Sequence, residues 1–429
     1  MIVKKLLFIF LIVLLTNQVS LSQQENIQNF YLTHPKILPE TITVGGPEAD
    51  IGEFSSKAIQ IAIDALSERG GGTVKLLPGT FEIQAPVCLA SNISLVGSGP
   101  ETILHKIDGI KTEFVVDADY GELKLTVANA KAFKKDMGIQ IYDKVQMAEC
   151  WNVTTAVITA IEGNTLYIDN FLVRDYHQND DGIVSNACPV VSAISVNNVR
   201  VADLTVDGNK ANNELMNGCV GGGIYLHKVS NAIVENCLVK DWNGDGISWQ
   251  ITEHVTVRNN EIYGCTNYGM HPGTGSPGTH IEGNNSHNNN SDGLYICWRV
   301  QHGVVSDNQF HNNKGYGICT GHKDSDMLFV NNHIYENDKG GVNLRRERAS
   351  NAPHRSTFRD NIVENNGTYG FLLQSPATDV LIENNTIRDT GSGAQEIGIF
   401  ISQNGLPAIL KDNQLSGHKK GNIVNNAGK

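Results

Sequence analysis

A repeat of 24 residues is the feature that most constrains the fold of this 429-residue chain. An asparagine that precedes a short apolar segment recurs through the C-terminal half, and from residue 236 to residue 332 each step is 24 residues. A period in the twenties indicates a solenoid. The asparagines are Asn236, Asn260, Asn284, Asn308, Asn332, Asn361, Asn385 and Asn413, and glycines that open an apolar strand recur with them at Gly246, Gly269, Gly293, Gly317, Gly341, Gly370 and Gly398.

The composition of the repeat distinguishes between two kinds of solenoid. A leucine-rich repeat has a similar period but needs a dense L-x-x-L-x-L core, which this sequence lacks. The units carry β-branched residues, Gly and Asn instead, as the coils of a parallel β-helix do. Asparagines in register can share amide hydrogen bonds along the axis. We therefore interpret them as structural, and predict an all-β solenoid, a parallel β-helix, over residues 191–423.

The N-terminus has the pattern of a signal peptide. Lys4 and Lys5 precede an apolar segment, Leu6–Leu15, and Ser20–Ser22 offers small residues for cleavage after residue 22. The segment is short for a membrane span, and no second one of that length follows. We expect residues 1–22 to be removed from a secreted or periplasmic protein without a membrane span.

Residues 41–107 combine one helix with short strands. Residues 55–69 show helical periodicity, with Ser55 or Ser56 as the N-cap and Gly70 as the stop. Short strands are predicted at 73–76, 78–81 and 93–97. The motifs GGGTVKLLPGTFEI and SNISLVGSGPETIL follow the helix.

This arrangement resembles the N-terminal module of the pectate-lyase-like superfamily of right-handed parallel β-helix proteins, and the resemblance covers about residues 41–423 apart from 108–190. It implies that the helix caps the open end of the coil and that the protein acts on carbohydrate, since the superfamily contains polysaccharide lyases, glycoside hydrolases, uronate epimerases and phage tail proteins. The segment YGMHPG, residues 268–273, is similar to the Y-G-x-D-P-H segment of mannuronan epimerases, with His271 in place of Asp and Gly273 in place of His.

Residues 108–190 interrupt the repeat. Alternating strands joined by turns, with Gly163-Asn164 as one turn, predict a small β insertion. The complete expected organisation is a signal peptide (1–22), an N-terminal cap with the first coils (41–107), the β insertion (108–190) and the repeats (191–423).

Charge and cysteine content limit the partners. The formal net charge is −12, and loss of Lys4 and Lys5 lowers it by two, to −14. Such a chain does not favour nucleic acid or anionic membranes. Export permits disulfides, but the spacing of the eight cysteines does not reveal a pairing, and we expect buried thiols with one or two bridges: Cys88, Cys150, Cys188, Cys219, Cys237, Cys265, Cys297 and Cys319. The oligomeric state stays open.

Side chains alternate along a strand, so the second and fourth residues after each coil glycine should point outward and align from coil to coil. This outward stripe and the longer loop after Gly341 are rich in His, Tyr, Trp and Arg, which predicts a functional groove. The candidate substrate-binding residues are His227, Gln250, Trp298, Arg299, Arg346, Glu347, His354 and Arg355, and the candidate catalytic residues are His271, Tyr295, His322, Lys323 and Arg345.

A lyase acting on a uronate-containing, acidic polysaccharide is the favoured hypothesis. β-Elimination needs a cation on the carboxylate, a base for the C5 proton and an acid for the leaving oxygen. Arg345 or Arg346 with Lys323 could supply the cation, His271 or His322 the base, and Tyr295 the acid. Calcium could replace the arginines, although no acidic cluster has an obvious ligand spacing.

Two other functions stay open. A glycoside hydrolase needs two carboxyl groups, for which the candidates are Asp245, Asp292, Asp324, Asp326 and Glu347. A non-catalytic glycan-binding protein would need Trp298 and the arginines alone.

Overall fold

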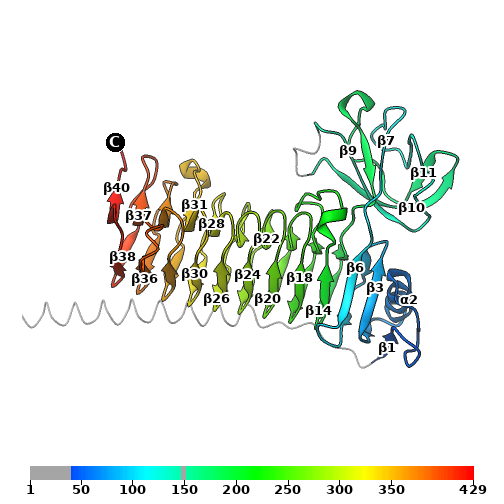
Figure 1. Cartoon of the computed structure of the whole chain (residues 1–429), viewed down its shortest axis with the longest axis horizontal. Helices are drawn as coiled ribbons and strands as arrows, with labels where there is room; N and C mark the ends of the chain where they lie inside the picture. Colours follow the sequence, from blue (N-terminus) through cyan, green and yellow to red (C-terminus); the bar gives the residue numbers. More distant parts are fainter. Residues whose placement is uncertain (1–39, 146–150) are drawn as a thin grey trace, which may run out of the picture.

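Three long parallel sheets form the body of the molecule, which is a computed structural model that describes residues 40–145 and 151–429. The chain passes from one sheet to the next and returns one strand further along, so that the coils stack along the longest axis (Figure 1). The predicted signal peptide, residues 1–22, lies outside the described residues.

Strands that are neighbours within a sheet are hydrogen-bonded to each other along the axis of the coil. In axial order, the first sheet contains β1 (Thr41–Val44), β2 (Gly72–Leu76), β5 (Ile93–Val96), β14 (Asn197–Ala202), β17 (Ser230–Glu235), β20 (Glu253–Arg258), β23 (His280–Glu282), β26 (Val304–Ser306), β29 (Leu328–Val330), β32 (Thr357–Arg359), β35 (Leu381–Glu383) and β38 (Ile409–Lys411). The second sheet contains β3 (Gly79–Ile83), β6 (Thr102–Lys106), β15 (Thr205–Asp207), β18 (Leu238–Lys240), β21 (Glu261–Tyr263), β24 (Asn285–His287), β27 (Gln309–His311), β30 (His333–Tyr335), β33 (Ile362–Glu364), β36 (Thr386–Arg388) and β39 (Gln414–Ser416). The third sheet contains β4 (Val87–Leu89), β13 (Val191–Ile194), β16 (Ile224–His227), β19 (Ile247–Gln250), β22 (Met270–Gly273), β25 (Leu294–Tyr295), β28 (Tyr316–Thr320), β31 (Gly340–Leu344), β34 (Tyr369–Leu373), β37 (Ile397–Ile401) and β40 (Gly421–Asn425).

The recurring glycines stand where the coils approach one another most closely. A Cβ atom added to Gly293 would lie 3.0 Å from the carbonyl oxygen of Gly317, and one added to Gly341 would lie 2.6 Å from that of Gly370. A side chain at either position would press on the next coil. The glycine repeat is therefore a packing requirement of the stacked strands.

The asparagine repeat forms a buried ladder, as predicted. In each step the backbone N and side-chain Nδ2 of one asparagine donate to Oδ1 of the next, as from Asn284 to Asn308 at 2.9 Å each. The ladder contains Asn260, Asn284, Asn308, Asn332, Asn361, Asn385 and Asn413. Asn236 does not belong to it, because Cys237 occupies that position and donates its backbone N to Asn260. Asn236 instead binds Asp203 at the surface.

The helix α2 (Ser56–Ser67) closes the first coil. Ser55 is its N-cap, and the Ser55 side chain accepts a hydrogen bond from the backbone N of Ala58. Its apolar face, which includes Ile59, Ile63 and Leu66, is buried in the same core as the first coils. The predicted capping helix is confirmed, and it shields a coil end that would otherwise expose its core and strand edges.

The β insertion forms a separate six-stranded sheet that projects from the body near α2 (Figure 1). Its strands are β7 (Lys111–Glu113), β12 (Ile183–Ser185), β9 (Gly138–Tyr142), β10 (Thr154–Glu162), β11 (Thr165–Ile168) and β8 (Lys124–Thr126). Glu162 pairs with Thr165, so Gly163-Asn164 is the two-residue turn that the sequence predicts. A core that is distinct from the core of the coils holds the insertion together.

The cysteines form no disulfide in the described ranges. Seven of them lie in these ranges and none is bridged to another of the seven, and Cys150 lies outside the described residues. The expected one or two bridges are thus absent among these seven. No helix of residues 40–145 and 151–429 has the length and apolarity needed to span a membrane.

Candidate functional site

The outer face of the third sheet carries most of the predicted site residues. Leu226, Trp249 and Ile318 fill the core, whereas the residues between the inward ones face outward, as the alternation predicts. Tyr225, Ser248 and His271 align across β16, β19 and β22, and Tyr295, Cys319 and Asn343 align across β25, β28 and β31.

The N-terminal part of this face is covered by residues 209–222. The hydroxyl of Tyr225 donates to the carbonyl of Cys219 at 2.6 Å, and that of Ser248 donates to the carbonyl of Gly218 at 2.5 Å. Gln250 is fully buried. The sequence predicts an open groove that begins at His227. This prediction is wrong for the N-terminal part of the face, because the loop 209–222 folds back over β16, β19 and β22.

The insertion also reaches this part of the face. The ring of Trp151 lies 5.4 Å from that of His227, and burial lowers the pKa of His227 to about 4. His227 and Gln250 are thus enclosed by other parts of the chain.

Five residues, which we call the inner cluster, lie under or beside this cover. His271 and Tyr295 are on β22 and β25, and the other three flank strands of the same sheet: Asp245 before β19, Tyr268 before β22 and Arg345 after β31. Nδ1 of His271 lies 2.6 Å from Oδ2 of Asp245, and His271 is 4% exposed. Tyr268 and Tyr295 stack with their ring centroids 4.1 Å apart, and the ring of His271 meets the edge of each at 5.5 Å.

Arg345 crosses the face from β31 toward the earlier coils. Its guanidinium carbon lies 4.4 Å from the centroid of the Tyr295 ring, and Nη1 donates to the carbonyl of Ile296 at 2.8 Å. Nη2 lies 3.6 Å from Oδ2 of Asp324 and makes no hydrogen bond with the described residues. Arg345 is therefore held within the protein as part of the inner cluster.

The charges of the inner cluster follow from burial and ion pairing. Burial by itself lowers the pKa of His271, but the charge and hydrogen bond of Asp245 outweigh this effect and raise the pKa to about 10. Burial raises the pKa of the Tyr295 hydroxyl, although the Arg345 cation opposes it. At neutral pH His271 is a cation, and Tyr295 keeps its proton.

Two further carboxyl groups lie close to the inner cluster. Burial raises the pKa of Asp292 and of Asp324 to about 6 each. Oδ1 of Asp292 accepts the backbone N of Tyr316 at 2.6 Å, and Asp324 accepts the backbone N atoms of Gly321 and Val300. Asp324 thus links its own turn to the preceding coil.

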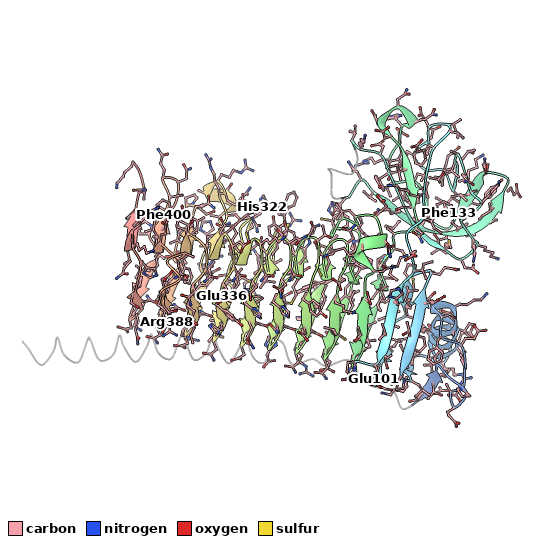
Figure 2. The ribbon with its side chains drawn as sticks, in the orientation of Figure 1. Glu101, Phe133, His322, Glu336, Arg388 and Phe400 are labelled. Carbon is pink, nitrogen blue, oxygen red and sulfur yellow. The ribbon has the colours of Figure 1, made fainter. Side chains whose placement is uncertain are left out.

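A second group, which we call the outer cluster, lies just after β25, β28 and β31: the exposed Trp298 and the half-buried His322 and Glu347. Trp298 is 48% exposed, and its ring stacks on that of His322 with centroids 5.0 Å apart. Nδ1 of His322 lies 3.4 Å from Oε2 of Glu347. Figure 2 labels His322 at the upper margin of the coil, opposite Arg388 of β36.

The predicted cations divide into free and paired ones. Arg299, Lys323 and Arg346 are exposed around the outer cluster. Arg355 forms two hydrogen bonds of 2.7 Å with Asp326. The ring of His354 contacts Ala349 of its own loop through Nε2 and Thr378 of the next coil through Nδ1. Arg355 and His354 thus hold the loop that follows β31.

The structure brings His271, Tyr295 and Arg345 together, and places His322 and Lys323 in the turn that holds Asp324, which lies 3.6 Å from Arg345. The sequence did not single out Tyr268 as a site residue, although it stands directly before a coil glycine, as Asp245 and Asp292 do. In the described ranges no group of three or more His, Cys, Asp or Glu residues is arranged to hold a metal ion.

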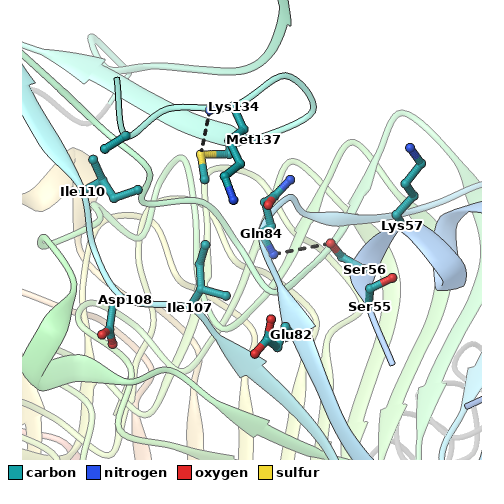
Figure 3. A pocket seen from close by; sticks show the side chains of 11 residues that line it. Ser55, Ser56, Lys57, Glu82, Gln84, Ile107, Asp108, Ile110, Lys134 and Met137 are labelled. Carbon is teal, nitrogen blue, oxygen red and sulfur yellow. Dashed lines mark hydrogen bonds between the residues drawn. The ribbon is translucent and has the colours of Figure 1, made fainter. Parts of the chain in front are cut away.

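A cavity of about 500 Å³ lies elsewhere, between the first coils and the insertion (Figure 3). Glu82, Gln84, Asp108, Lys134 and Met137 are among its lining residues. It shares no lining residue with the inner or outer cluster.

The fold and this face define a right-handed parallel β-helix protein. The family model described as the right handed beta helix region matches residues 192–353 and 349–429, more than half of the chain, and the chain belongs to this family. The predicted resemblance to the pectate-lyase-like superfamily is thereby confirmed for the fold.

Solved structures share this fold at low sequence identity. The A-module of mannuronan C-5 epimerase AlgE6 from Azotobacter vinelandii has a TM-score of 0.56 and 16% identity, covering 93% of this chain and 97% of that one. The A-module of AlgE4 from the same organism has a TM-score of 0.56 and 17% identity over 92% and 96%. An exopolygalacturonase from Thermotoga maritima has a TM-score of 0.55 and 15% identity over 95% and 96%. No curated protein sequence matches the chain.

Proposed function

We propose that this protein is an exported enzyme that binds an acidic polysaccharide along the outer face of the third sheet and cleaves it by β-elimination. The observation that carries the proposal is the outer cluster, in which an exposed Trp298 stacks on His322 among three exposed cations. Two structural neighbours, a mannuronan epimerase and an exopolygalacturonase, are consistent with a uronate-containing substrate.

Each residue of the outer cluster suits one part of substrate binding. An exposed indole ring packs against the apolar face of a sugar ring. Lys323 and Arg346 are exposed and can neutralise uronate carboxylates, which makes the C5 proton more acidic. The half-buried Arg345 is not needed for this role.

The proton transfers are assigned to His322 and Tyr295. His322 takes the C5 proton, with Glu347 orienting the ring and balancing its charge. The bond from C4 to the glycosidic oxygen breaks, a double bond forms between C4 and C5, and the leaving oxygen takes the proton of Tyr295. The Arg345 cation above the Tyr295 ring stabilises the resulting phenolate.

The test is a panel of uronate polysaccharides assayed for unsaturated products by ultraviolet absorbance. Tyr295→Phe and His322→Gln should each lower the rate by about 100-fold or more, since general acid–base groups contribute about that much. Tyr335→Phe, a half-buried tyrosine on the second sheet, is the matched control and should leave the rate unchanged. Full activity of both site variants would refute the assignment.

A glycoside hydrolase is the second candidate, favoured by the pKa of about 6 that burial gives Asp292. A carboxyl group with a raised pKa can donate a proton to a leaving oxygen near neutral pH. The same panel would then give new reducing ends without an absorbing double bond, and Asp292→Asn would abolish them. Binding without either product would identify a non-catalytic glycan-binding protein.

A further inference from the structure

Cys297 is a half-buried cysteine on the outer face of the third sheet that the proposed β-elimination does not use. It stands opposite Gly273 in a parallel bridge, and its backbone N donates to the carbonyl of Pro272 at 2.8 Å. Gly273 and His271 are two residues apart on β22, so the side chains of His271 and Cys297 project from the same face. Gly273 has no side chain to separate them.

Asp245, His271 and Cys297 lie on three successive coils in this order. Asp245 holds Nδ1 of His271 at 2.6 Å, so Nε2 faces away from Asp245. Nε2 is buried and has no hydrogen-bond partner among the described residues. Burial lowers the pKa of His271, whereas Asp245 and Cys297 both raise it.

A second buried donor without a partner in the described part of the chain lies beside Cys297. Nη1 of Arg345 binds the carbonyl of Ile296, the residue that precedes Cys297, and Nη2 makes no hydrogen bond. A donor in this position suits an oxyanion that forms next to the sulfur atom.

The other described cysteines lack this setting. Burial raises the pKa of Cys188 to about 11 and that of Cys237, Cys265 and Cys319 to about 12. Cys88 is exposed on the same sheet, and its Sγ lies 3.4 Å from the Ser192 hydroxyl. Burial raises the pKa of the Cys88 thiol as well, so Cys88 serves as a control thiol that has no histidine beside it.

We propose that Cys297, His271 and Asp245 form a nucleophile–base–carboxylate triad that hydrolyses carboxylic esters carried on a carbohydrate. An arrangement in which a third group orients the base is the general signature of an activated nucleophile. The exposed Trp298 follows Cys297 directly and provides the surface for the sugar. This activity is separate from chain cleavage and does not depend on it.

The reaction needs only water and the ester. In the reacting state the proton is on the His271 ring, which the Asp245 carboxylate stabilises as a cation, and the sulfur of Cys297 reacts as a thiolate and bonds to the ester carbonyl carbon. The oxyanion forms near Nη2 of Arg345. When the ester C–O bond breaks, the alcohol takes the proton from His271 and leaves a thioester on Cys297. Water then loses a proton to the neutral His271 ring and attacks the thioester, which releases the acid and restores the thiolate beside the charged ring.

The test combines acetate release with thiol labelling of the full-length protein. p-Nitrophenyl acetate and glucose pentaacetate are the ester probes, and iodoacetamide labelling is followed by mass spectrometry. At neutral pH Cys297 should label about tenfold or more faster than Cys88, which has no histidine beside it. Acetate release should fall about 100-fold or more in Cys297→Ala and after labelling.

Controls separate the triad from a loss of folding. Cys88→Ala should keep full esterase activity, and Asp245→Asn should slow both acetate release and the labelling of Cys297. Far-ultraviolet circular dichroism and the unfolding midpoint show whether each variant is folded. Absence of acetate release by the wild type, undiminished release by folded Cys297→Ala, or equal labelling of Cys88 and Cys297 would overturn the proposal.

Discussion

His271 and Arg345 are a buried and a half-buried cation on the outer face of the third sheet, and each is placed next to a buried carboxylate. Asp245 pairs with His271 at 2.6 Å, and Asp324 lies 3.6 Å from Arg345. Removing one partner of a buried ion pair leaves an uncompensated charge and is strongly destabilising. The pair of His271 and Asp245 therefore contributes to folding as well as to the charge of the site.

This pair predicts a specific pH dependence of stability. The pKa of His271 is raised from 6.5 to about 10 in the folded protein, so its stabilising contribution is complete below pH 6.5 and is lost as the pH rises toward 10. Asp245→Asn should lower the free energy of unfolding at pH 6 by about 3 kcal/mol and flatten its decline between pH 6.5 and 10.

Denaturant unfolding at a series of pH values measures both effects. Asp326→Asn, which breaks the exposed pair with Arg355, is the control and should change stability by less than about 1 kcal/mol. Identical pH slopes for the wild type and Asp245→Asn would contradict the assignment.

At the scale of the strand and turn, each coil is joined to the next by side-chain amides as well as by the backbone. A second buried ladder accompanies the predicted one and contains Asn289, Asn313, Asn337, Asn366 and Gln395. It follows the strands of the second sheet, whereas the first ladder precedes them. Each strand of this sheet from β24 to β33 is therefore preceded by an asparagine of the first ladder and followed by an asparagine of the second.

A break in the second ladder should destabilise the coils on both sides of it. Asn337→Ala would leave the backbone N and the Nδ2 of Asn313 without their shared acceptor. An unsatisfied buried donor costs about 1–3 kcal/mol, so we expect a loss of about 3 kcal/mol in the free energy of unfolding in urea. The exposed Gln309→Ala on β27 should change it by less than about 0.5 kcal/mol, and an equal effect of both changes would refute the role of the ladder.

At the scale of the whole molecule, the protein consists of a capped coil with an attached module. The helix α2 covers the N-terminal end, and the insertion has its own core. The chain leaves and re-enters the coil at one place, because Ile110 and Asn186 are hydrogen-bonded to each other through their backbones. This geometry makes the insertion separable from the coil.

Excision of residues 111–185, with a Gly-Gly link between Ile110 and Asn186, should leave a folded β-helix. We expect a cooperative unfolding transition and a far-ultraviolet spectrum rich in β structure, because the core of the coils is retained. A control deletion of residues 55–69, which removes α2, should instead cause aggregation. If the excised chain also failed to fold, the coil would depend on the insertion.

The sequence predicted the features of the fold that repeat or that depend on local chemistry. Glycines and asparagines at a fixed period indicate stacked coils, Ser55 indicates a helix start, and Gly163-Asn164 indicates a hairpin. The assignment of Asn236 to the ladder was wrong because the first step is 23 residues, from Cys237 to Asn260, and a period read from sequence does not resolve a shift of one residue.

The candidate site was predicted only in part. The alternation of side chains along a strand placed His271, Tyr295 and Arg345 on one face, because that alternation is a local property of the backbone. The burial of this face under residues 209–222 could not be predicted, because that loop lies outside the repeat.

The sequence by itself determined the coil and the face that carries the polar and aromatic residues, because these follow from a period and an alternation. Only the tertiary structure decided which side chains are paired and which are free. It joined His271 to Asp245, enclosed Arg345 against Tyr295 and left Trp298 and Arg346 exposed. Charge and reactivity depend on such contacts between coils and loops, and these contacts arise only when the chain is folded.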